Sequence, residues 1–335
     1  FTKLNICSIN EQMKSLFKKK PFIIAEIGSN HCGQIKLALK AIDEAKKSGA
    51  DAIKFQTINF KEIYKNPKKY ERKYKNIQIP LAWYPELYSR AKQKKILIST
   101  SPTYLKAVKE VEKYIDFFKV ASPQSTGFSQ IIDEIIKTKK KFIVSTGYCD
   151  EKKIKELIKK IKKKKCAILH CISDYPPKDK SININFLDKL KKISKLPVGF
   201  SDHTIGNEAS ILAIGQGATI IEKHVRLKGT SKNSPDYKNS IEFSKFKQFV
   251  KKCHISFAML GLNEKILTKN EFKSRKKLLV YPFYKKSYLK GKRITYNDII
   301  FLRSNFHSNI EIKKILNKKL KKNIKKLMPV KLNDF

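Results

Sequence analysis

Residues 22–31 read Phe-Ile-Ile-Ala-Glu-Ile-Gly-Ser-Asn-His, an apolar run that ends in a polar and ionisable cluster. The chain contains eight apolar runs of this kind, each rich in Ile, Val, Phe or Ala and as long as a buried strand. Several of them also end in polar or ionisable residues. In chain order the runs are Phe22–Gly28, Ala52–Thr57, Ile96–Thr100, Phe117–Ser122, Phe142–Gly147, Ala167–Cys171, Pro197–His203 and Thr219–Leu227.

Most of the gaps between the runs have the pattern of an amphipathic helix, with apolar residues at helical spacing and Lys on the other face. We expect helices at Lys36–Lys47, Pro85–Lys95, Tyr104–Lys113, Gln130–Thr138, Glu151–Lys164, Asn185–Ile193, Asn207–Gln216 and Ile241–Leu260. Strands that alternate with helices in this way predict an α/β fold, the (β/α)₈ TIM barrel, whose chemistry lies where the strands end. The gap Ile58–Tyr84 is interpreted as a long loop, a candidate lid or partner contact.

The chain has 335 residues, whereas a barrel of this kind takes roughly 250. We therefore predict a barrel domain over residues 15–262, a linker over 263–277 and a small mixed α/β domain over 278–335. No apolar stretch approaches the roughly 18 residues that span a membrane, and residues 1–20 contain no signal-peptide core. The six Cys have no zinc-binding spacing, so we expect reduced thiols in a cytoplasmic protein.

The formal net charge is +45, from 74 Lys and Arg against 29 Asp and Glu. Such a balance suggests nucleic acid or an anionic membrane as a partner. However, only six of the basic residues are Arg, which nucleic-acid interfaces favour, and the Lys residues are dispersed. We expect a solvated, Lys-rich surface with no membrane partner and no specific nucleic acid. Duplex binding that survives physiological salt would favour the alternative, a nucleic-acid-binding protein.

Two histidines end the seventh and eighth runs, which are neighbours in a closed barrel. His203 and His224 could there share a divalent metal. Asp202 or Glu222 could orient the two imidazole rings. The alternative is that the two histidines are unrelated and each has a structural role.

Two lysines end the second and fourth runs, and a lysine inside a barrel mouth needs an anionic partner. Lys54 and Lys119, with hydroxyls such as those of Ser122 and Ser145, would suit a phosphate or a carboxylate. Either lysine could instead form a Schiff base, as in lysine aldolases, or a structural ion pair. Glu26 could be a general base, a metal ligand or the partner of one of these lysines.

The same motifs, taken in order, resemble the sialic acid synthase family, which comprises N-acetylneuraminate synthase and its relatives that make pseudaminic and legionaminic acids. The resemblance runs from about Pro21 to Gly261, and the tail resembles the antifreeze-like (SAF) domain of that family. The matching stretches are Ile24–His31, Gly49–Thr57, Ser99–Pro102, Phe118–Ser122, Ser145–Gly147, Leu169–Cys171, Tyr175-Pro176, Gly199–Thr204 and Ile221–His224.

The resemblance implies a reaction: condensation of phosphoenolpyruvate with an N-acyl amino sugar to a nine-carbon 2-keto sugar acid, with release of phosphate. It implies Mn²⁺ or Mg²⁺ at His203 and His224. It also implies a homodimer in which the small domain is swapped and reaches the sugar of the partner. The residues to which it gives roles are Glu26, Lys54 and Lys119 in catalysis, and Gln56, Thr100, Ser122, Ser145, Tyr175, Ser201 and Arg303 in substrate binding.

The sequence departs from the family pattern at several positions. Pro123-Gln124-Ser125 follows Ser122, where many members continue with Gly-Glu, and Ser304-Asn305-Phe306-His307 replaces the Gly-rich stretch that usually follows the arginine. The acceptor sugar therefore stays open. The alternatives are another phosphoenolpyruvate-dependent or aldolase-type TIM-barrel enzyme, or a diverged family member with a different acceptor.

Overall fold

The computed structural model describes residues 20–306 and 310–335. This part of the chain divides into two compact units, the first ending at Gly261 and the second running from Leu262 to Phe335. Residues 15–19 of the predicted barrel domain and His307 of the segment after Arg303 lie outside the described residues. Each unit is described by itself below.

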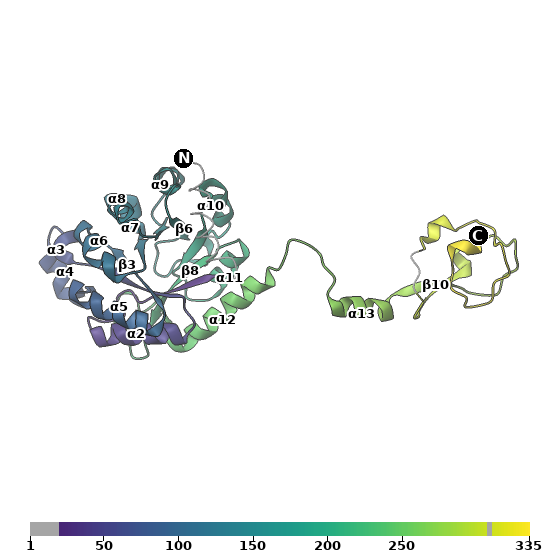
Figure 1. The fold of residues 1–335 in the computed structure, drawn as a ribbon, viewed down its shortest axis with the longest axis horizontal. Coiled ribbons are helices and arrows are strands. Elements are labelled where there is room, and N and C mark those ends of the chain that lie inside the picture. The colour runs from purple at the N-terminus through teal and green to yellow at the C-terminus, as the bar shows by residue number, and fades with distance from the viewer. Residues whose placement is uncertain (1–19, 307–309) are drawn as a thin grey trace. The chain divides into compact units, whose positions relative to one another are not determined.

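The first unit is built on eight parallel strands that close on themselves, because β1 pairs with both β2 and β8. The predicted (β/α)₈ TIM barrel is thereby confirmed, and Figure 1 shows the strands inside a ring of helices. Each strand coincides with one of the eight apolar runs to within a few residues. The strands are β1 (Phe22–Glu26), β2 (Ala52–Thr57), β3 (Leu97–Pro102), β4 (Phe117–Val120), β5 (Phe142–Ser145), β6 (Cys166–Cys171), β7 (Val198–Asp202) and β8 (Ile220–Arg226).

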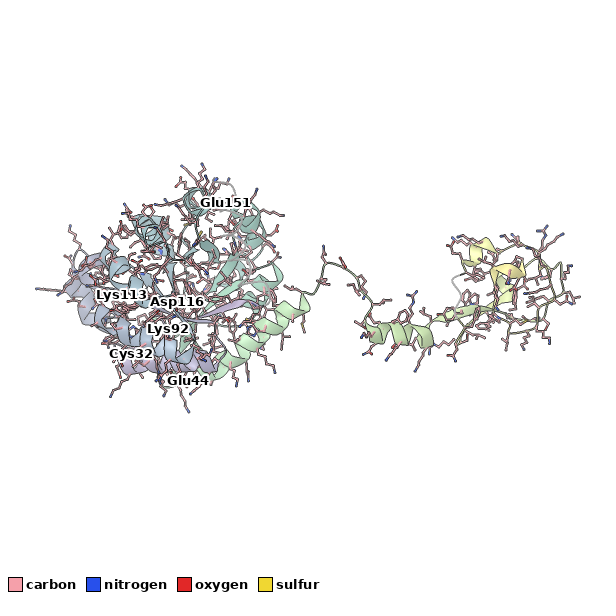
Figure 2. All side chains as sticks on the ribbon, viewed as in Figure 1. Cys32, Glu44, Lys92, Lys113, Asp116 and Glu151 are labelled. Atoms are coloured by element: carbon pink, nitrogen blue, oxygen red, sulfur yellow. The ribbon has the colours of Figure 1, made fainter. Side chains whose placement is uncertain are left out.

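Eight helices cover the outside of the barrel at the predicted places. In one of them, α9, the Asp150 side chain accepts a hydrogen bond from the Lys153 amide and so caps the first turn. Four apolar residues of α9 are buried at helical spacing, while its polar side faces outward. Figure 2 shows charged side chains such as Glu44, Lys92 and Glu151 on these helices. The helices are α2 (Ile35–Lys47), α5 (Tyr84–Lys94), α6 (Leu105–Val111), α8 (Gln130–Lys137), α9 (Glu151–Ile161), α10 (Phe186–Ser194), α11 (Glu208–Gly215) and α12 (Phe243–Met259).

The interior of the barrel changes character along its axis. Towards the amino ends of the strands, inward-facing apolar residues such as Ile24, Phe117 and Ile220 form a small cluster of their own. Towards the carboxyl ends, buried charged residues such as Glu26 and Lys119 take the inward positions. Because charges are costly to bury without partners, we expect the functional site at this end of the barrel.

The gap predicted as a long loop contains helical turns. It holds α3 (Phe60–Ile63) and α4 (Pro67–Tyr74), followed by two short 3₁₀ helices. The Asn59 side chain accepts from the Lys61 amide at the start of α3, and Phe60 is buried. Capping and a single buried aromatic residue stabilise a turn that is too short to show helical periodicity in the sequence.

The second unit is small, and its predicted linker is partly helical. Helix α13 (Lys269–Leu278) begins with a capping box, in which Thr268 and Glu271 each bond the other's backbone amide. Strands β10 (Val280–Tyr284) and β11 (Ile299–Arg303) then pair antiparallel. Their likeness to an antifreeze-like domain stays a prediction. Among the described residues, no helix is long and apolar enough to cross a membrane.

Candidate active site

Four charged side chains meet inside the barrel, towards the carboxyl ends of its strands. Lys54 on β2 lies between two carboxylates: its Nζ is 2.5 Å from Oε2 of Glu26 and 3.9 Å from Oε1 of Glu222. The same oxygen of Glu222 lies 3.4 Å from Nζ of Lys119 on β4. All four side chains are buried. Two lysines and two carboxylates therefore form one compensated cluster from four different strands.

The two carboxylates of the cluster have pKa values that move in opposite directions. Burial raises the pKa of Glu26 above its ordinary value, although Lys54 opposes the shift. Burial also acts on Glu222, but Lys119 and Lys54 outweigh it and lower the pKa of Glu222 to about 2. Carboxylates whose pKa values are pushed apart suit different tasks. The lysines thus favour the ionised form of Glu222, whereas burial favours the protonated form of Glu26.

The two lysines also differ in pKa. Burial lowers the pKa of Lys119, and Glu222 only partly offsets this. For Lys54 burial is likewise the largest influence, but Glu222 and Glu26 together outweigh it and raise the pKa. Lys119 is thus the less compensated ammonium group. An anionic ligand beside it would stabilise its charged form.

Hydroxyl groups surround the cluster. The ammonium of Lys119 donates to Ser145 Oγ at 2.7 Å, and that of Lys54 donates to Ser101 Oγ at 3.3 Å. Ser201 donates to Glu222 Oε1 at 2.9 Å, and Ser122 donates to the sulfur of Cys171. The structure thus brings the predicted residues Ser122, Ser145 and Ser201 to the same end of the barrel as the two lysines.

Glu26 is held from its other side. Its Oε1 accepts hydrogen bonds from the Gln56 side chain at 2.9 Å and from the Gly28 amide at 3.0 Å. The backbone φ of Gly28 is +50°, and a Cβ there would meet the Asp236 carboxylate at 2.4 Å. Glycine at this position therefore lets the chain pass close to Asp236. Gln56 fixes the carboxylate of Glu26 and lies where the sequence predicts a binding residue.

The two predicted metal ligands lie side by side. The ring centroids of His203 and His224 are 5.4 Å apart, and the ring of Tyr175 lies over His203 at a centroid distance of 4.2 Å. Nδ1 of His203 is 2.8 Å from the carbonyl of Ile172. Because a carbonyl only accepts, this nitrogen carries the hydrogen, and Nε2 of His203 keeps its lone pair.

The histidine pair offers nitrogen ligands to a metal. Nδ1 of His224 is buried and has no hydrogen-bond partner among the described residues, and Oδ1 of Asp236 lies 3.8 Å from it. Buried polar atoms are rarely left unpaired in proteins, so an unpaired imidazole nitrogen fits a metal ligand. Within the described residues no group of three or more His, Cys, Asp or Glu side chains could hold an ion. A metal held by the two imidazoles would thus take its remaining ligands from substrate or water.

A second ion pair lies behind the histidines, on the outer side of the strands. Lys223 lies 3.0 Å from the Asp202 carboxylate and donates to the carbonyls of Thr204 and Gly206. Both charged side chains are buried, and they immediately precede His224 and His203 in the sequence. Since side chains alternate along a strand, this outward pair fixes two strands whose next residues face the site.

Thr100, which the resemblance places at the substrate, is not part of the inward cluster. Its hydroxyl lies 2.8 Å from that of Thr57 and 2.7 Å from that of Tyr84, and it bonds the carbonyl of Phe55. Tyr84 belongs to α5, so this network lies between the barrel and its outer helices. The inward place on β3 is taken by the neighbouring residue Ser101, whose hydroxyl Lys54 reaches.

We expect the substitution Thr100→Val to reduce the stability of the protein and to spare substrate binding. The variant leaves the buried hydroxyls of Thr57 and Tyr84 with fewer partners, at a cost of about 1–3 kcal/mol in the free energy of unfolding. The KM for the substrate should stay within about twofold of the wild type. Urea denaturation and steady-state kinetics measure the two effects. A KM raised more than about tenfold in a variant of unchanged stability would contradict the structure.

Besides Ser101, two further site residues lie outside the predicted set. Asp236, in the loop after β8, accepts hydrogen bonds at 2.7 Å from the amide and the hydroxyl of Ser29 and faces His224. Cys171, at the end of β6, lies 3.9 Å from Nδ1 of His203. Burial raises the pKa of this thiol, but His203 and Lys119 outweigh it and lower the pKa to about 7. Asp236 stands among turns with no periodic pattern, so the sequence carries no signal for it.

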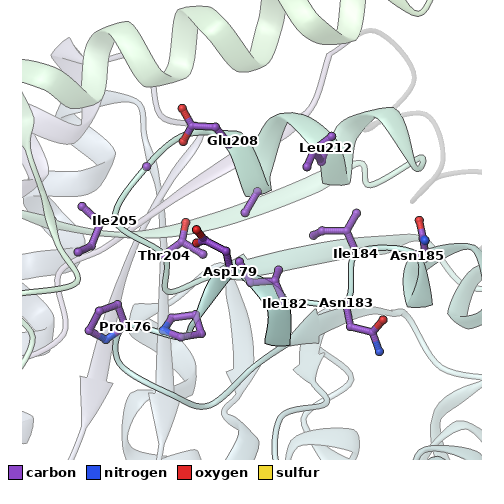
Figure 3. Close-up of a pocket in the computed structure, with 13 residues that line it drawn as sticks. Pro176, Asp179, Ile182, Asn183, Ile184, Asn185, Thr204, Ile205, Glu208 and Leu212 are labelled. Atoms are coloured by element: carbon purple, nitrogen blue, oxygen red, sulfur yellow. The ribbon is translucent and has the colours of Figure 1, made fainter.

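Two predicted sugar-binding residues have different surroundings. Tyr175 lies at the mouth against His203 and is about half exposed. The two residues that follow it, Pro176 and Pro177, line a cavity of about 550 Å³, formed by the loops that follow β6 and β7 together with α11 (Figure 3). Arg303 ends β11 in the second unit, where it is exposed. Its contact with a sugar stays a prediction.

Comparison with known proteins yields one family and several relatives. The model of the NeuB family matches residues 41–265. A pseudaminic acid synthase of Campylobacter jejuni is 33% identical over 341 residues, which cover 95% of this chain and 97% of that protein. An N,N'-diacetyllegionaminic acid synthase of Legionella pneumophila is 31% identical over 316 residues, 84% of this chain and 85% of that protein. The crystal structure of an N-acetylneuraminic acid synthetase from Leptospira borgpetersenii superimposes with a TM-score of 0.71 at 28% identity, covering 76% of this chain and 90% of that one.

Proposed function

The chain belongs to the NeuB family, and from this premise we propose that it condenses phosphoenolpyruvate with an N-acyl amino sugar. The product is a nine-carbon 2-keto sugar acid, and phosphate is released. One observation carries the proposal: the mouth of the barrel gathers two buried lysines, a carboxylate with a raised pKa and a histidine pair. The lysines would bind an anionic donor, and the carboxylate would accept a proton. The histidine pair would hold a metal ion that activates the carbonyl of the acceptor.

The donor would bind at the lysines. Phosphoenolpyruvate carries a phosphate and a carboxylate, and both accept charge-assisted hydrogen bonds. Lys119 and Ser145 form one donor pair, and Lys54 and Ser101 form a second. Ser122 lies close to the first pair, beside Gly147. We assign the donor's phosphate to Lys119, the less compensated of the two ammonium groups.

A divalent cation, Mn²⁺ or Mg²⁺, would be held by His203 and His224, and when bound it supplies a Lewis acid for the carbonyl oxygen of the acceptor. The protein's own groups have other tasks. Tyr175 lies over His203 and would flank the acceptor. The carbonyl of Ile172 keeps the hydrogen of His203 on Nδ1 and so leaves Nε2 free as a ligand.

Glu26 would handle the proton of the reaction. Attack by the enol carbon on the acceptor carbonyl leaves positive charge at the carbon that bears the phosphate, and water then adds to that carbon. The Glu26 carboxylate, oriented by Gln56 and the Gly28 amide, would stabilise this charge and take the proton of the water. Its raised pKa makes it a better base than Glu222. Collapse of the tetrahedral intermediate then breaks the carbon–oxygen bond and expels phosphate.

The acceptor that we propose first is a diacetamido-trideoxy hexose that gives a pseudaminic-acid-type product. Among the relatives described above, the pseudaminic acid synthase aligns over nearly the full length of both chains. The segment Pro123–Ser125 starts the short helix α7 (Ser122–Gly127), next to the proposed donor site, and departs from the Gly-Glu of many members. N-acetylmannosamine is the acceptor to compare.

A phosphate-release assay tests the proposal. Phosphoenolpyruvate and Mn²⁺ are combined in parallel with N-acetylmannosamine and with the two diacetamido-trideoxy hexoses. We expect release with one of these sugars and none without a sugar. Borohydride trapping of an adduct on Lys54 or Lys119 would instead indicate Schiff-base aldolase chemistry. Absence of release with every sugar, together with no thermal stabilisation by phosphoenolpyruvate, would contradict the proposal.

We expect the affinity for Mn²⁺ to fall about tenfold per pH unit as the pH drops below the pKa of His203. Burial lowers the pKa of His203, but Cys171 and the Ile172 carbonyl outweigh it and raise the pKa above 6.5. Burial lowers the pKa of His224 to about 4. Since the metal binds neutral imidazole, a raised pKa lets protons compete from a higher pH, and only His203 takes part until the pH approaches the pKa of His224. Calorimetric titration at several pH values measures how the Mn²⁺ affinity changes with pH. A fall of about a hundredfold per pH unit, which means two competing protons, or no change with pH, would contradict this account.

A further inference from the structure

Tyr148 is a large aromatic residue in a strained backbone conformation at the mouth of the barrel. It belongs to the turn that follows β5, in which the Cys149 amide donates to the carbonyl of Thr146. The backbone φ of Tyr148 is +61°, a conformation that favours Gly or Asn at the third position of such a turn. The side chain is 64% exposed, so burial of the ring does not offset the strain. Strained residues that persist in a fold cluster at active sites and ligand contacts.

Contacts on both sides of Tyr148 hold it in this conformation. Helix α7 lies against the turn, and its Thr126 hydroxyl donates to the carbonyl of Gly147 at 3.0 Å. The same hydroxyl lies 3.1 Å from the sulfur of Cys149. The residues before and after Tyr148 are thus both fixed by one side chain of α7. The departure from the family pattern at Pro123–Ser125 lies in the same helix, so it bears on how Tyr148 is held.

The turn also lies directly against the proposed donor site. A Cβ on Gly147 would lie 2.6 Å from Oγ of Ser122 and 2.1 Å from Oγ of Ser173, so only glycine allows this close approach. Ser122 belongs to the proposed donor site, and Ser173 belongs to the loop after β6 that carries Tyr175. Oγ of Ser173 is buried and has no hydrogen-bond partner among the described residues. Tyr148, the residue after Gly147, is therefore next to both the donor site and that loop.

Tyr148 and Tyr175 lie close enough to influence each other. Burial is the main cause that raises the pKa of Tyr175, and the charges of Cys171, Asp236 and Tyr148 raise it further. Because such an influence falls off with distance, the hydroxyls of the two tyrosines lie near one another. Tyr175 in turn lies over the ring of His203 at a centroid distance of 4.2 Å. The two tyrosines thus form an aromatic wall that leads from the histidine pair to the donor site.

We propose that Tyr148 determines the choice of acceptor, because its ring packs against the sugar beside Tyr175. The proposal rests on the reaction proposed above. A diacetamido-trideoxy hexose carries an acetamido group and a methyl group where N-acetylmannosamine carries a hydroxyl and a hydroxymethyl group. An aromatic ring packs well against the methyl and acetamido groups, but it would leave the hydroxyls of N-acetylmannosamine without hydrogen-bond partners. Tyr148 therefore favours the diacetamido-trideoxy hexose.

Steady-state kinetics of three variants test the proposal. Tyr148→Asn removes the ring and suits the backbone conformation, so its melting temperature should not fall. We expect this variant to lower the ratio of kcat/KM for the preferred diacetamido-trideoxy hexose to kcat/KM for N-acetylmannosamine by at least about tenfold. Its KM for phosphoenolpyruvate should stay within about twofold of the wild type. Tyr148→Phe keeps the ring and should keep the ratio. The matched control is Lys95→Asn, which places asparagine at another left-handed position, φ +54°, at the end of α5 and should change neither quantity.

The outcomes separate the role of Tyr148 from the reaction on which it rests. A folded Tyr148→Asn variant whose ratio stays within about twofold of the wild type would overturn the role and leave the reaction intact. The same holds for a Tyr148→Phe variant that loses the preference, or a wild type that prefers N-acetylmannosamine. If the wild type releases no phosphate with N-acetylmannosamine, the kcat/KM of Tyr148→Asn for the diacetamido-trideoxy hexose should itself fall by at least about tenfold. Absence of release by the wild type with every sugar would contradict the reaction, and the role of Tyr148 with it.

Discussion

Replacing His203 with alanine is expected to lower the rate of phosphate release by about 1,000-fold or more. The residue would supply one of the two imidazole ligands that we propose for the cation. The cation's Lewis acidity would stabilise the transition state by several kcal/mol, and each 1.36 kcal/mol corresponds to about tenfold in rate. Its ring is held by the Ile172 carbonyl and lies beside Tyr175 and His224.

The matched control for this substitution is His254→Ala, which removes a half-buried histidine of α12. The metal content of each purified variant is measured together with its rate of phosphate release. We expect the His203 variant to lose both bound Mn²⁺ and activity, and the His254 variant to keep both. If the His203 variant retained stoichiometric metal and a rate within about tenfold of the wild type, the assignment of the metal to the histidine pair would be wrong.

The second large effect is expected at Lys119. The substitution Lys119→Met keeps the apolar stem of the side chain and removes the ammonium group that we assign to the donor's phosphate. Loss of one partner of a buried, hydrogen-bonded charge pair costs roughly 2–5 kcal/mol. The KM for phosphoenolpyruvate should therefore rise by at least about 30-fold. Glu222 keeps Lys54 as a neighbour at 3.9 Å, so the variant should still fold.

Two measurements check the Lys119 prediction. Steady-state kinetics give the KM, and thermal denaturation with and without phosphoenolpyruvate gives the stabilisation by the donor, which should disappear. The control Lys163→Met removes an exposed lysine after α9 and should change neither quantity. If both variants bound the donor as the wild type does, the phosphate would have to bind elsewhere.

The strands and outer helices of the barrel could be predicted from the sequence because parallel strands are buried on both faces. They read as short, continuous apolar runs, and each outer helix must turn one apolar side towards them. The helical turn Phe60–Ile63 escaped prediction, because it depends on a cap and a single buried aromatic residue rather than on a periodic pattern.

The direction in which a strand residue points was harder to predict than its place. On β3, Ser99, Thr100 and Ser101 are all small and polar. The residue types therefore do not indicate which of these side chains point into the barrel and which point outward. The register with β2 turns Ser101 towards Lys54 and Thr100 towards Tyr84. On β7 and β8 the ionisable residues themselves alternate, and there His203 and His224 reach the site while Asp202 and Lys223 pair behind it.

Which carboxylate pairs with which lysine in the charge cluster also could not be predicted from the sequence. Glu222 could be predicted to orient a histidine, yet it bridges Lys54 and Lys119, which lie on two other strands. Closure of the barrel brings these strands together, and no spacing along the chain encodes the distances between the side chains. Asp236 is similar, since its loop returns to Ser29 more than 200 residues away in sequence.

The most direct test of the central claim follows one oxygen atom. Phosphoenolpyruvate labelled with ¹⁸O in the bond between its second carbon and the phosphorus is incubated with Mn²⁺ and the accepted sugar, and both products are analysed by mass spectrometry. Our account predicts that the label appears in phosphate, alongside a nine-carbon 2-keto sugar acid. Label retained in the keto acid, or pyruvate formed without a condensed product, would contradict it.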